Sequence, residues 1–223
     1  MTLAQPIAVD LFAGAGGFGL GFKMAGFSIP LSVEIDTWAC DTLRYNHPDM
    51  TVIQYDIRDF NTESQVKEIC IFKPDIIIGG PPCQGFSIAG PAQKDPKDPR
   101  NTLFINFAQW ISFLQPKAFV MENVKGLLSR KNVDGIKVID IIKNTFEELG
   151  YLVEVWLLNA AEYGVPQIRE RVFIIGNNTG KKIGAPPKRY SLGLLNFNHF
   201  QLSILDHEKL FPAFTVMKLL LKG

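Results

Sequence analysis

The fold of this 223-residue chain follows from one segment near its start, Ile7-Ala-Val-Asp-Leu-Phe-Ala-Gly-Ala-Gly-Gly-Phe-Gly-Leu-Gly21. The apolar run from Ile7 to Phe12 predicts a buried strand. It leads directly into the pattern Gly14-x-Gly16-x-x-Gly19, after which the residues from Phe18 to Ala25 predict a helix. Glycines in such a turn let the backbone bend tightly and approach a ligand closely. The segment therefore predicts an α/β fold with a ligand at the end of its first strand.

A second predicted strand, from Ile29 to Ile35, carries an acidic residue near its end. Glu34 follows Gly14 by 20 residues, the spacing at which a carboxylate can accept hydrogen bonds from ribose hydroxyls. We therefore expect an adenosine-containing ligand, and the simpler alternative is a solvated acid beside a glycine-rich turn. The pattern by itself does not separate a dinucleotide from S-adenosylmethionine.

Strands and helices then alternate along the chain. A third predicted strand, 51–55, is followed by Asp56, which by position could equally reach an adenine amino group or cap the helix that follows. Helices are predicted at 37–46, 62–72, 102–114 and 133–149, and further strands at 151–158 and 172–176. The buried side of these helices is expected to include Cys70, Phe107 and Trp110.

A cysteine follows the most apolar run of the chain, in Ile76-Ile-Ile-Gly-Gly-Pro-Pro-Cys-Gln-Gly-Phe-Ser87. The run predicts a buried strand, and two prolines fix the backbone of the turn after it. Cys83 is thereby expected at the mouth of a sheet, where parallel α/β proteins usually keep their chemistry. Taken alone, Cys83 would more often be a small buried residue in a tight turn. The polar, proline-rich residues 88–101 that follow predict a mobile loop beside the site.

Two further polar pairs are expected near the same edge. The fifth predicted strand, 118–121, delivers Glu122 and Asn123, which are costly at the end of a buried strand unless they have partners. Arg169 and Arg171 are two residues apart before a strand, so their side chains point to the same side. For Glu122 and Asn123, the simpler alternative to a catalytic role is a structural salt bridge. For the two arginines, the simpler alternative to a clamp for an anion or a base is a pair of surface residues.

Composition narrows the class of protein without naming it. Hydrophobic residues make up 47% and charged residues 20% of the chain, which suits a packed core, and the net charge of +1 neither favours nor excludes nucleic acid. The three cysteines and three histidines show no disulfide or metal-ligand spacing. We expect no metal, no signal peptide and no membrane span, and therefore a cytoplasmic protein.

Taken in order, these motifs resemble those of the DNA cytosine-5 methyltransferase family of the bacterial restriction–modification type. The resemblance rests on Asp10-Leu-Phe-Ala-Gly-Ala-Gly-Gly, Glu34, Asp56, Pro81-Pro-Cys-Gln-Gly-Phe-Ser, Glu122-Asn-Val and Gln167-x-Arg-x-Arg. It implies a doubly wound, mostly parallel seven-stranded sheet of the Rossmann-like, S-adenosylmethionine-dependent methyltransferase type, with an antiparallel seventh strand.

The resemblance also implies roles for individual residues. S-adenosylmethionine would be held by Phe12, Gly14, Gly16, Glu34, Asp56 and Pro82. Cys83 would be the nucleophile, with Glu122, Asn123, Arg169 and Arg171 around it. The substrate would be double-stranded DNA whose cytosine is flipped out of the helix, because a stacked base cannot be reached. An RNA cytosine is the alternative substrate, and a nicotinamide-dependent oxidoreductase would explain only the glycine-rich turn.

The end of the chain departs from the family pattern. We expect a catalytic domain at 1–176 and a truncated or atypical extension at 177–223, because the 47 residues after Gly176 contain no Arg-rich recognition segment. One expectation is a second chain that carries the target-recognition domain. The other is a remnant that binds the cofactor or a partner chain and is inactive alone.

Overall fold

The computed structural model describes residues 5–82, 103–132 and 134–189. Its sheet consists of β1 (Ile7–Leu11), β2 (Ser28–Glu34), β3 (Thr51–Gln54), β4 (Ile76–Gly79), β5 (Ala118–Val124), β6 (Leu152–Asn159) and β7 (Glu170–Asn177). The α-helices are α1 (Gly17–Met24), α2 (Thr37–Asn46), α3 (Glu63–Ile69), α4 (Leu103–Leu114) and α5 (Val138–Glu148). Short 3-10 helices are η1 (Ile57–Asp59), η5 (Lys125–Leu128) and η6 (Ala160–Tyr163).

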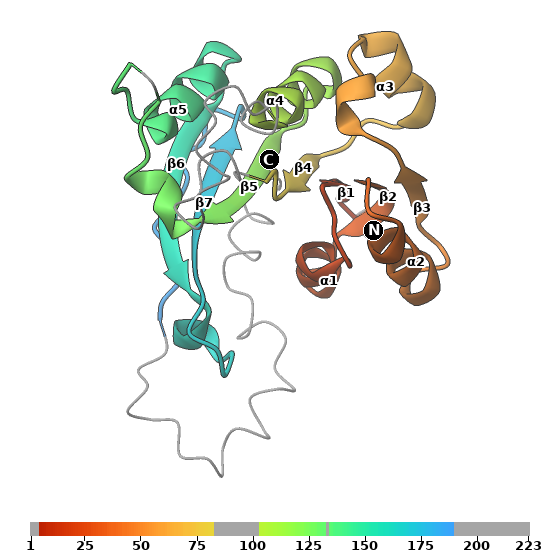
Figure 1. The fold of residues 1–223 in the computed structure, drawn as a ribbon, viewed down its shortest axis with the longest axis horizontal. Helices are drawn as coiled ribbons and strands as arrows, with labels where there is room; N and C mark the ends of the chain where they lie inside the picture. The colour runs from red at the N-terminus through yellow and green to blue at the C-terminus, as the bar shows by residue number, and fades with distance from the viewer. Residues whose placement is uncertain (1–4, 83–102, 133, 190–223) are drawn as a thin grey trace.

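The seven strands form one sheet in the order β3-β2-β1-β4-β5-β7-β6 (Figure 1). The first five are mutually parallel, and β7 is antiparallel to both of its neighbours. The predicted doubly wound, mostly parallel sheet with an antiparallel seventh strand is confirmed. The strand order reverses between β1 and β4, and ligands of such sheets bind at the carboxyl ends of the strands beside this reversal.

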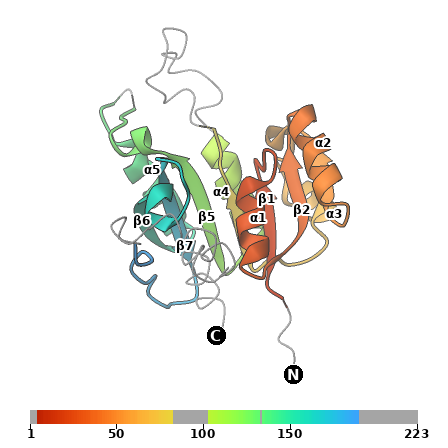
Figure 2. The same cartoon turned by 90° about the horizontal axis from the view of Figure 1, so that it is seen from below.

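Helices cover both faces of the sheet (Figures 1 and 2). One core layer contains Phe22 of α1 and Leu43 of α2 packed with Ile76 and Ile78. The other layer contains residues of α3, α4 and α5 packed with Ile77. Because successive side chains of β4 point to opposite faces, an unbroken isoleucine run fills both layers. The predicted core residues Cys70, Phe107 and Trp110 are all buried.

Two helices are shorter than their sequence patterns predict. The helix predicted at 62–72 spans only Glu63–Ile69, because Cys70 leaves the helical conformation and its thiol donates to the Phe72 carbonyl at 3.4 Å. The helix predicted at 133–149 begins at Val138, because the Asn132 side chain accepts hydrogen bonds from the amides of residues 134 and 136 and closes a turn instead. Such local side-chain bonds compete with a helix.

β5 extends further than predicted, and β1 ends earlier. β5 continues to Val124, so Glu122 and Asn123 lie within the strand and not beyond it. The cause is its pairing with β7, which runs as far as Val124 opposite Arg171. β1 ends at Leu11 because Phe12 has a φ of 56°, a left-handed conformation that strands do not adopt.

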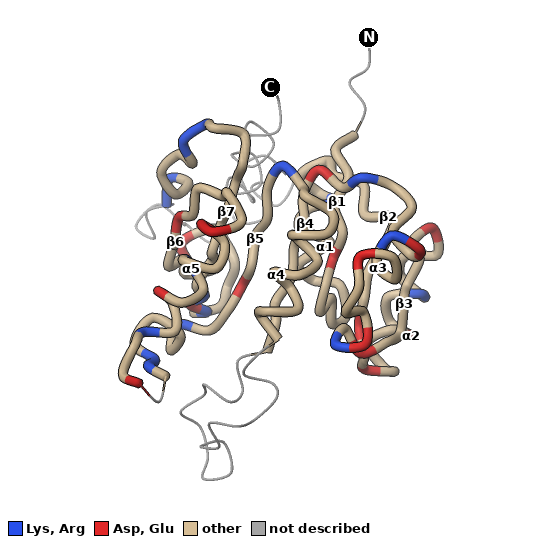
Figure 3. Tube along the Cα trace, turned by 90° about the horizontal axis from the view of Figure 1, so that it is seen from above, with Lys and Arg blue, Asp and Glu red and all other residues tan. Residues whose placement is uncertain are grey.

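No helix in the described ranges is long and apolar enough to cross a membrane. Figure 3 shows lysines and arginines interspersed with acidic residues along the same ranges. Residues 178–189 pack back onto the sheet domain, where the Tyr163 hydroxyl donates to the carbonyl of buried Pro187 at 3.3 Å and Ile183 contacts the core. The proposed division of the chain at residue 176 stays a prediction.

Candidate active site

The glycine turn after β1 is held by a carboxylate from β2. The amide of Gly14 donates to Oε2 of Glu34 at 2.7 Å, across the 20 residues that separate them in sequence. The other carboxylate oxygen accepts the amides of Ile35 at 2.8 Å and Asp36 at 2.9 Å. Gly14 and Gly16 have φ values of 56° and 88°, which side chains other than glycine rarely adopt. The structure therefore brings together the turn and the acid that the sequence predicted.

Beside the turn there is room for a ligand. A Cβ on Gly14 would meet no atom of the described residues within 4 Å. Phe12, at the start of the turn, is half-buried against the core and has a positive φ. Non-glycine residues in this conformation concentrate at functional sites. Ile35, the residue after Glu34, exposes 60% of its surface. These features suit the binding of a nucleoside, although the individual contacts to it remain predictions.

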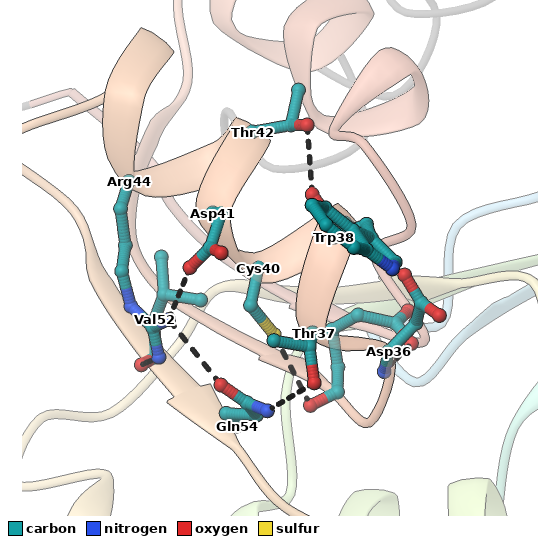
Figure 4. A network of polar contacts seen from close by, with 11 residues as sticks. Asp36, Thr37, Trp38, Cys40, Asp41, Thr42, Arg44, Val52 and Gln54 are labelled. Atoms are coloured by element: carbon teal, nitrogen blue, oxygen red, sulfur yellow. Dashed lines mark hydrogen bonds and ion pairs between the residues drawn. The ribbon is translucent and has the colours of Figure 1, made fainter.

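A network on α2 fixes the end of β2 and its neighbour β3 (Figure 4). The thiol of Cys40 donates to the backbone carbonyl of Glu34 at 3.5 Å, and Gln54, the last residue of β3, donates to Thr37 Oγ1 at 2.9 Å. Asp36 caps α2 by accepting the Ala39 amide at 2.8 Å. Because Glu34 and Gln54 are paired in the sheet, these bonds tie the ends of β2 and β3 together to α2.

Asp56 caps the 3-10 helix η1 after β3. Its carboxylate accepts the amide of Arg58 at 3.0 Å and forms an ion pair with the guanidinium of the same residue. The Arg58 hydrogen bond is the main cause that lowers the pKa of Asp56 below its usual range. Of the two roles that the sequence left open, capping is therefore present in the structure, and a contact with adenine remains a prediction.

The carboxyl ends of three neighbouring strands come together at one point. Leu11 is paired with Gly79, and Gly79 with Met121, so the residues that follow them, Phe12, Gly80 and Glu122, lie side by side. A Cβ on Gly80 would be 3.5 Å from Glu122 Oε2. Sheet pairing thus places the glycine turn next to the end of β4 and the acid of β5.

Two arginines of the chain meet at Glu122. Arg171 Nε lies 2.9 Å from Glu122 Oε1, and Arg169 Nη2 lies 3.9 Å from the same oxygen. Burial raises the pKa of the Glu122 carboxyl above its usual value, because it outweighs the opposing effect of Arg171 and Arg169. A carboxyl group whose pKa is raised in a partly buried site is a candidate proton donor. The salt bridge that the sequence left as the simpler alternative for Glu122 is therefore present, and a clamp for an anion or a base stays a prediction.

Asn123 is buried, and its hydrogen bonds go to the backbone. Its amide nitrogen donates to the Pro81 carbonyl at 3.0 Å, and its side-chain oxygen accepts the Val124 amide at 2.8 Å. Asn123 thus ties β5 to the proline turn after β4, which ends at half-buried Pro82. Sequence reasoning predicted Asn123 as a catalytic residue, whereas the geometry supports a role in holding the turn. Cys83 and the predicted loop at 88–101 lie outside the described residues.

Sequence reasoning missed Asp10, which it quoted only as part of a motif. This carboxyl group is 1% exposed in the middle of the sheet, and burial together with the Glu34 charge raises its pKa to about 8. An acid inside an otherwise apolar strand was the available signal. Among the described residues, no group of three or more His, Cys, Asp or Glu side chains is arranged to hold a metal ion.

The strand order, with β7 antiparallel between β5 and β6, places the fold in the Rossmann-like class of S-adenosylmethionine-dependent methyltransferases. Within this class, the chain belongs to the C-5 cytosine-specific DNA methylase family, whose sequence profile matches residues 7–212. The resemblance drawn from the motifs is confirmed.

Individual relatives agree with this assignment. The chain is 47% identical over 185 residues to the type II methyltransferase M.DdeI of Desulfomicrobium norvegicum, covering 81% of this chain and 44% of M.DdeI. It is 43% identical to M.AquIA of a Picosynechococcus species, covering 80% of this chain and 74% of M.AquIA. A solved structure from E. coli, assigned as a prophage-encoded DNA modification methyltransferase, is 33% identical with a TM-score of 0.70, covering 84% of this chain and 52% of that one. The chain therefore spans less than half the length of M.DdeI.

Proposed function

We propose that this chain is the catalytic part of a DNA cytosine-5 methyltransferase, which transfers a methyl group from S-adenosylmethionine to carbon 5 of cytosine in double-stranded DNA. The observation that carries the proposal is Glu122, a carboxyl group with a raised pKa that contacts Arg171 beside the proline turn leading to Cys83. The family assignment supports the same reaction.

The cofactor would bind across the carboxyl ends of β1, β2 and β4. The open side of the glycine turn offers backbone groups, and the Glu34 carboxylate can accept from ribose hydroxyls. Phe12, Gly16, Asp56 and Pro82 border the same region and complete the proposed set. Bound there, S-adenosylmethionine supplies the methyl group, and the residues of the chain orient it towards the end of β5.

Cys83 and Glu122 would activate the cytosine ring together. Addition of the Cys83 thiolate to carbon 6 forms a carbon–sulfur bond and moves the electrons of the 5,6 double bond into the ring. Protonated Glu122 can donate to ring nitrogen 3 and offset the charge that develops there. Carbon 5 would then take the methyl group as its bond to the sulfonium sulfur breaks, which leaves S-adenosylhomocysteine. A base removes the proton of carbon 5, the 5,6 double bond re-forms as the thiolate leaves, and ring nitrogen 3 returns its proton to Glu122. The cytosine must first be flipped out of the duplex, which costs a few kcal/mol.

Arg171 and Asn123 would position these groups. Arg171 orients the Glu122 carboxyl through the 2.9 Å contact. Asn123 holds the carbonyl of Pro81, two residues before the nucleophile. Neither residue needs to change its bonding for the reaction to proceed, so their contribution is preorganisation of the site.

A second chain is proposed to supply the recognition of the target sequence. The chain spans 44% of M.DdeI, which leaves more than half of that relative without a counterpart here. Under this proposal the catalytic residues come from this chain, and the choice of DNA sequence comes from the other. The alternative, a chain that binds cofactor or partner and is inactive alone, rests on the same observation.

A methyl-transfer assay tests the proposal. Cytosine-containing DNA and S-adenosylmethionine labelled in its methyl group are mixed with the purified chain, alone and together with a chain that carries a recognition domain. We expect label on cytosine carbon 5 in at least one condition and its loss in Cys83→Ser. Cys70→Ser is the matched control, because Cys70 is buried in the core and its pKa of about 11 keeps it a thiol. No label in any condition would leave the binding-only alternative.

A further inference from the structure

Asp10 occupies a position where carboxyl groups are rarely found. It lies on β1, paired with Ser32 of β2 on one side and Ile78 of β4 on the other, and it is 1% exposed. Burying an ionised carboxylate costs several kcal/mol unless charged partners compensate. No salt bridge to Asp10 is present among the described residues. The burial of Asp10 must therefore be compensated by contacts other than ion pairs.

One oxygen of Asp10 caps α1, the helix that follows the glycine turn. The residue at the N-cap is Gly16, which has no side chain for this task, and the third amide of the helix, that of Gly19, donates to the Asp10 carboxyl. A Cβ on Gly19 would lie 2.7 Å from Asp10 Oδ2, so only glycine lets the helix come this close. Asp10 thus replaces a missing N-cap side chain from a neighbouring strand.

The other oxygen of Asp10 has no partner in the described part of the chain, and Asp10 borders a small cavity. Oδ1 is buried and has no hydrogen-bond partner among the described residues. Asp10, Ser32 and His47 all line a cavity of about 10 Å³, the volume for the centre of a single water molecule. Ser32 is buried too, and its hydroxyl donates to the sulfur of Met50 at 3.0 Å, which leaves its oxygen free to accept.

Burial is the main reason why a neutral Asp10 is favoured at this cavity, whose lining also includes the cation Lys23. Burial and the charge of Glu34 raise its pKa to about 8, against a smaller opposing effect of the Gly19 bond. On the other side, Lys23 lies 3.2 Å from His47 Nδ1 and 3.7 Å from Asp49. Burial and Lys23 lower the pKa of His47, so the imidazole facing the cavity is neutral at pH 7.

We propose that Asp10 is a positioning residue of the cofactor site that works as a neutral acid. One oxygen accepts the Gly19 amide, and the protonated oxygen donates to a single buried water shared with Ser32. This role rests on the proposed function, because the turn that Asp10 braces is the one assigned to S-adenosylmethionine. The water accepts from Asp10 and donates to Ser32, whose own proton goes to Met50, so Oδ1 of Asp10 gains the partner that it otherwise lacks.

Ionisation of Asp10 would weaken cofactor binding. It places a second negative charge under the turn beside Glu34 and removes the proton that bonds the water. If only the neutral form holds the turn in its binding conformation, the apparent affinity scales with the neutral fraction. With a pKa of about 8, that fraction is about one tenth at pH 9. We therefore expect the dissociation constant for S-adenosylmethionine to rise about tenfold between pH 7 and pH 9.

Asp10→Asn provides the test, because it keeps an oxygen for Gly19 and cannot ionise. Calorimetric binding of S-adenosylmethionine at pH 7 and pH 9 should show the rise in the wild type and not in the variant. Asp49→Asn is the matched control, since Asp49 is exposed at the edge of the same cluster, and it should keep the wild-type pH dependence. Equal pH dependence in wild type and Asp10→Asn would overturn the proposal.

Urea unfolding of the protein without cofactor tests the neutral acid separately. The folded state holds the Asp10 proton to a higher pH than the unfolded state, so stability falls as pH rises from about 4 to about 8. Between pH 5 and 7 the unfolding constant of the wild type should rise by up to tenfold per pH unit relative to Asp10→Asn. The same pH dependence of the unfolding constant in the wild type and in Asp10→Asn would overturn the proposal. Normal unfolding behaviour with no cofactor binding at any pH would instead overturn the proposed function.

Two measurements on the wild type remain if Asp10→Asn does not fold. The infrared carbonyl band of a protonated carboxyl group should be present at pH 7 and disappear by pH 9.5, and its absence at pH 7 would overturn the proposal. A high-resolution crystal structure should show one water within hydrogen-bond distance of both Asp10 Oδ1 and Ser32 Oγ. A cavity without that water would overturn the shared-water arrangement.

Discussion

Glu122 shows how a carboxyl group can be ion-paired with an arginine and still have a raised pKa. Its contact with Arg171 orients the carboxyl, while burial between β4 and β5 raises the pKa. The result is an acid that is oriented before any substrate arrives. Proton donation by such a group contributes roughly 100- to 10,000-fold to the rate of a reaction.

Glu122→Gln should therefore lower methyl transfer by about 100-fold or more, because the amide cannot deliver a proton. Binding of S-adenosylmethionine should change little. Both are measured with labelled cofactor, by transfer to DNA and by equilibrium binding. Glu154→Gln on the exposed side of β6 is the control and should retain activity. A Glu122→Gln protein with wild-type transfer would exclude Glu122 as the acid.

Arg171→Ala should shift the pH dependence of the same reaction. Arg171 lowers the pKa of Glu122, so its removal should raise that pKa further and keep the carboxyl protonated to a higher pH. The alkaline limb of the pH–rate profile should move upward. Arg169→Ala is the comparison, and its shift should be smaller because Arg169 is 3.9 Å away against 2.9 Å for Arg171. A larger shift in Arg169→Ala would contradict this account.

The ends of β4 and β5 are positioned by contacts between strands, which the sequence pattern of one strand cannot show. Gly79 allows β4 to lie against β1, and Asn123 ties β5 to the proline turn. Both residues act on the placement of the turn that precedes Cys83. Their effects on stability and activity can be separated with matched variants elsewhere in the chain.

Asn123→Ala would leave the buried Pro81 carbonyl without its donor, which should reduce the free energy of unfolding by about 1–3 kcal/mol. It should also reduce methyl transfer beyond that loss of stability, because the turn is no longer held. Asn178→Ala removes a bond away from the site, from the Asn178 amide to the Pro116 carbonyl at 3.1 Å, and should cost less because that carbonyl keeps the Tyr151 hydroxyl as a donor. Urea unfolding and the transfer assay give both quantities. Equal activity in the two variants would argue against a positioning role for Asn123.

Gly79→Ala should strongly reduce the free energy of unfolding. Its Cβ would lie 2.3 Å from the Leu11 carbonyl oxygen and 3.0 Å from the Phe107 ring, so β1 and β4 must separate. Overpacking of this kind costs about 1–3 kcal/mol or more. In Gly126→Ala the new Cβ meets no described atom within 4 Å. Urea unfolding should show a large loss of stability for Gly79→Ala and little loss for Gly126→Ala. Unfolding curves that are similar for the two variants would refute the close approach of β1 and β4 at Gly79.

The molecule as a whole gathers its proposed sites along one edge of one sheet. The glycine turn, Glu34, the proline turn and Glu122 come from four parallel strands, whose carboxyl ends must meet at this edge. Residues from 12 to 171 thereby contribute to one region. Cofactor binding should consequently stabilise the entire domain and not a single segment.

S-adenosylmethionine at 100 times its dissociation constant should add about 2.7 kcal/mol to the free energy of unfolding. The melting temperature, followed by circular dichroism, should rise accordingly. Glu34→Gln should reduce the rise, because the amide accepts ribose hydroxyls less well and disturbs the bond to Gly14. Glu63→Gln on the surface of α3 is the control and should show the full rise. An unchanged rise in Glu34→Gln would remove Glu34 from the proposed site.

Much of this arrangement is determined by the sequence alone. Apolar runs separated by glycine and proline turns predicted every strand, since both faces of a central strand must be apolar when helices cover both. The order of the motifs identified the family, and the spacing from Gly14 to Glu34 predicted that the glycine turn and the acid belong to one site. Apolar runs, motif order and residue spacing are properties of the chain itself, so they can be read without knowing which residues are in contact.

The tertiary structure alone decided what the polar residues touch. Glu122 and Arg171 are 49 residues apart in sequence and meet because β7 runs antiparallel beside β5. Asn123 reaches Pro81 across 42 residues, and Asp10 is isolated only because helices and strands close over it. Sequence patterns record which side chains are buried, but the partner of a buried polar group depends on which strands become neighbours. That choice of neighbours is what sets the bonding and the pKa values at this edge of the sheet.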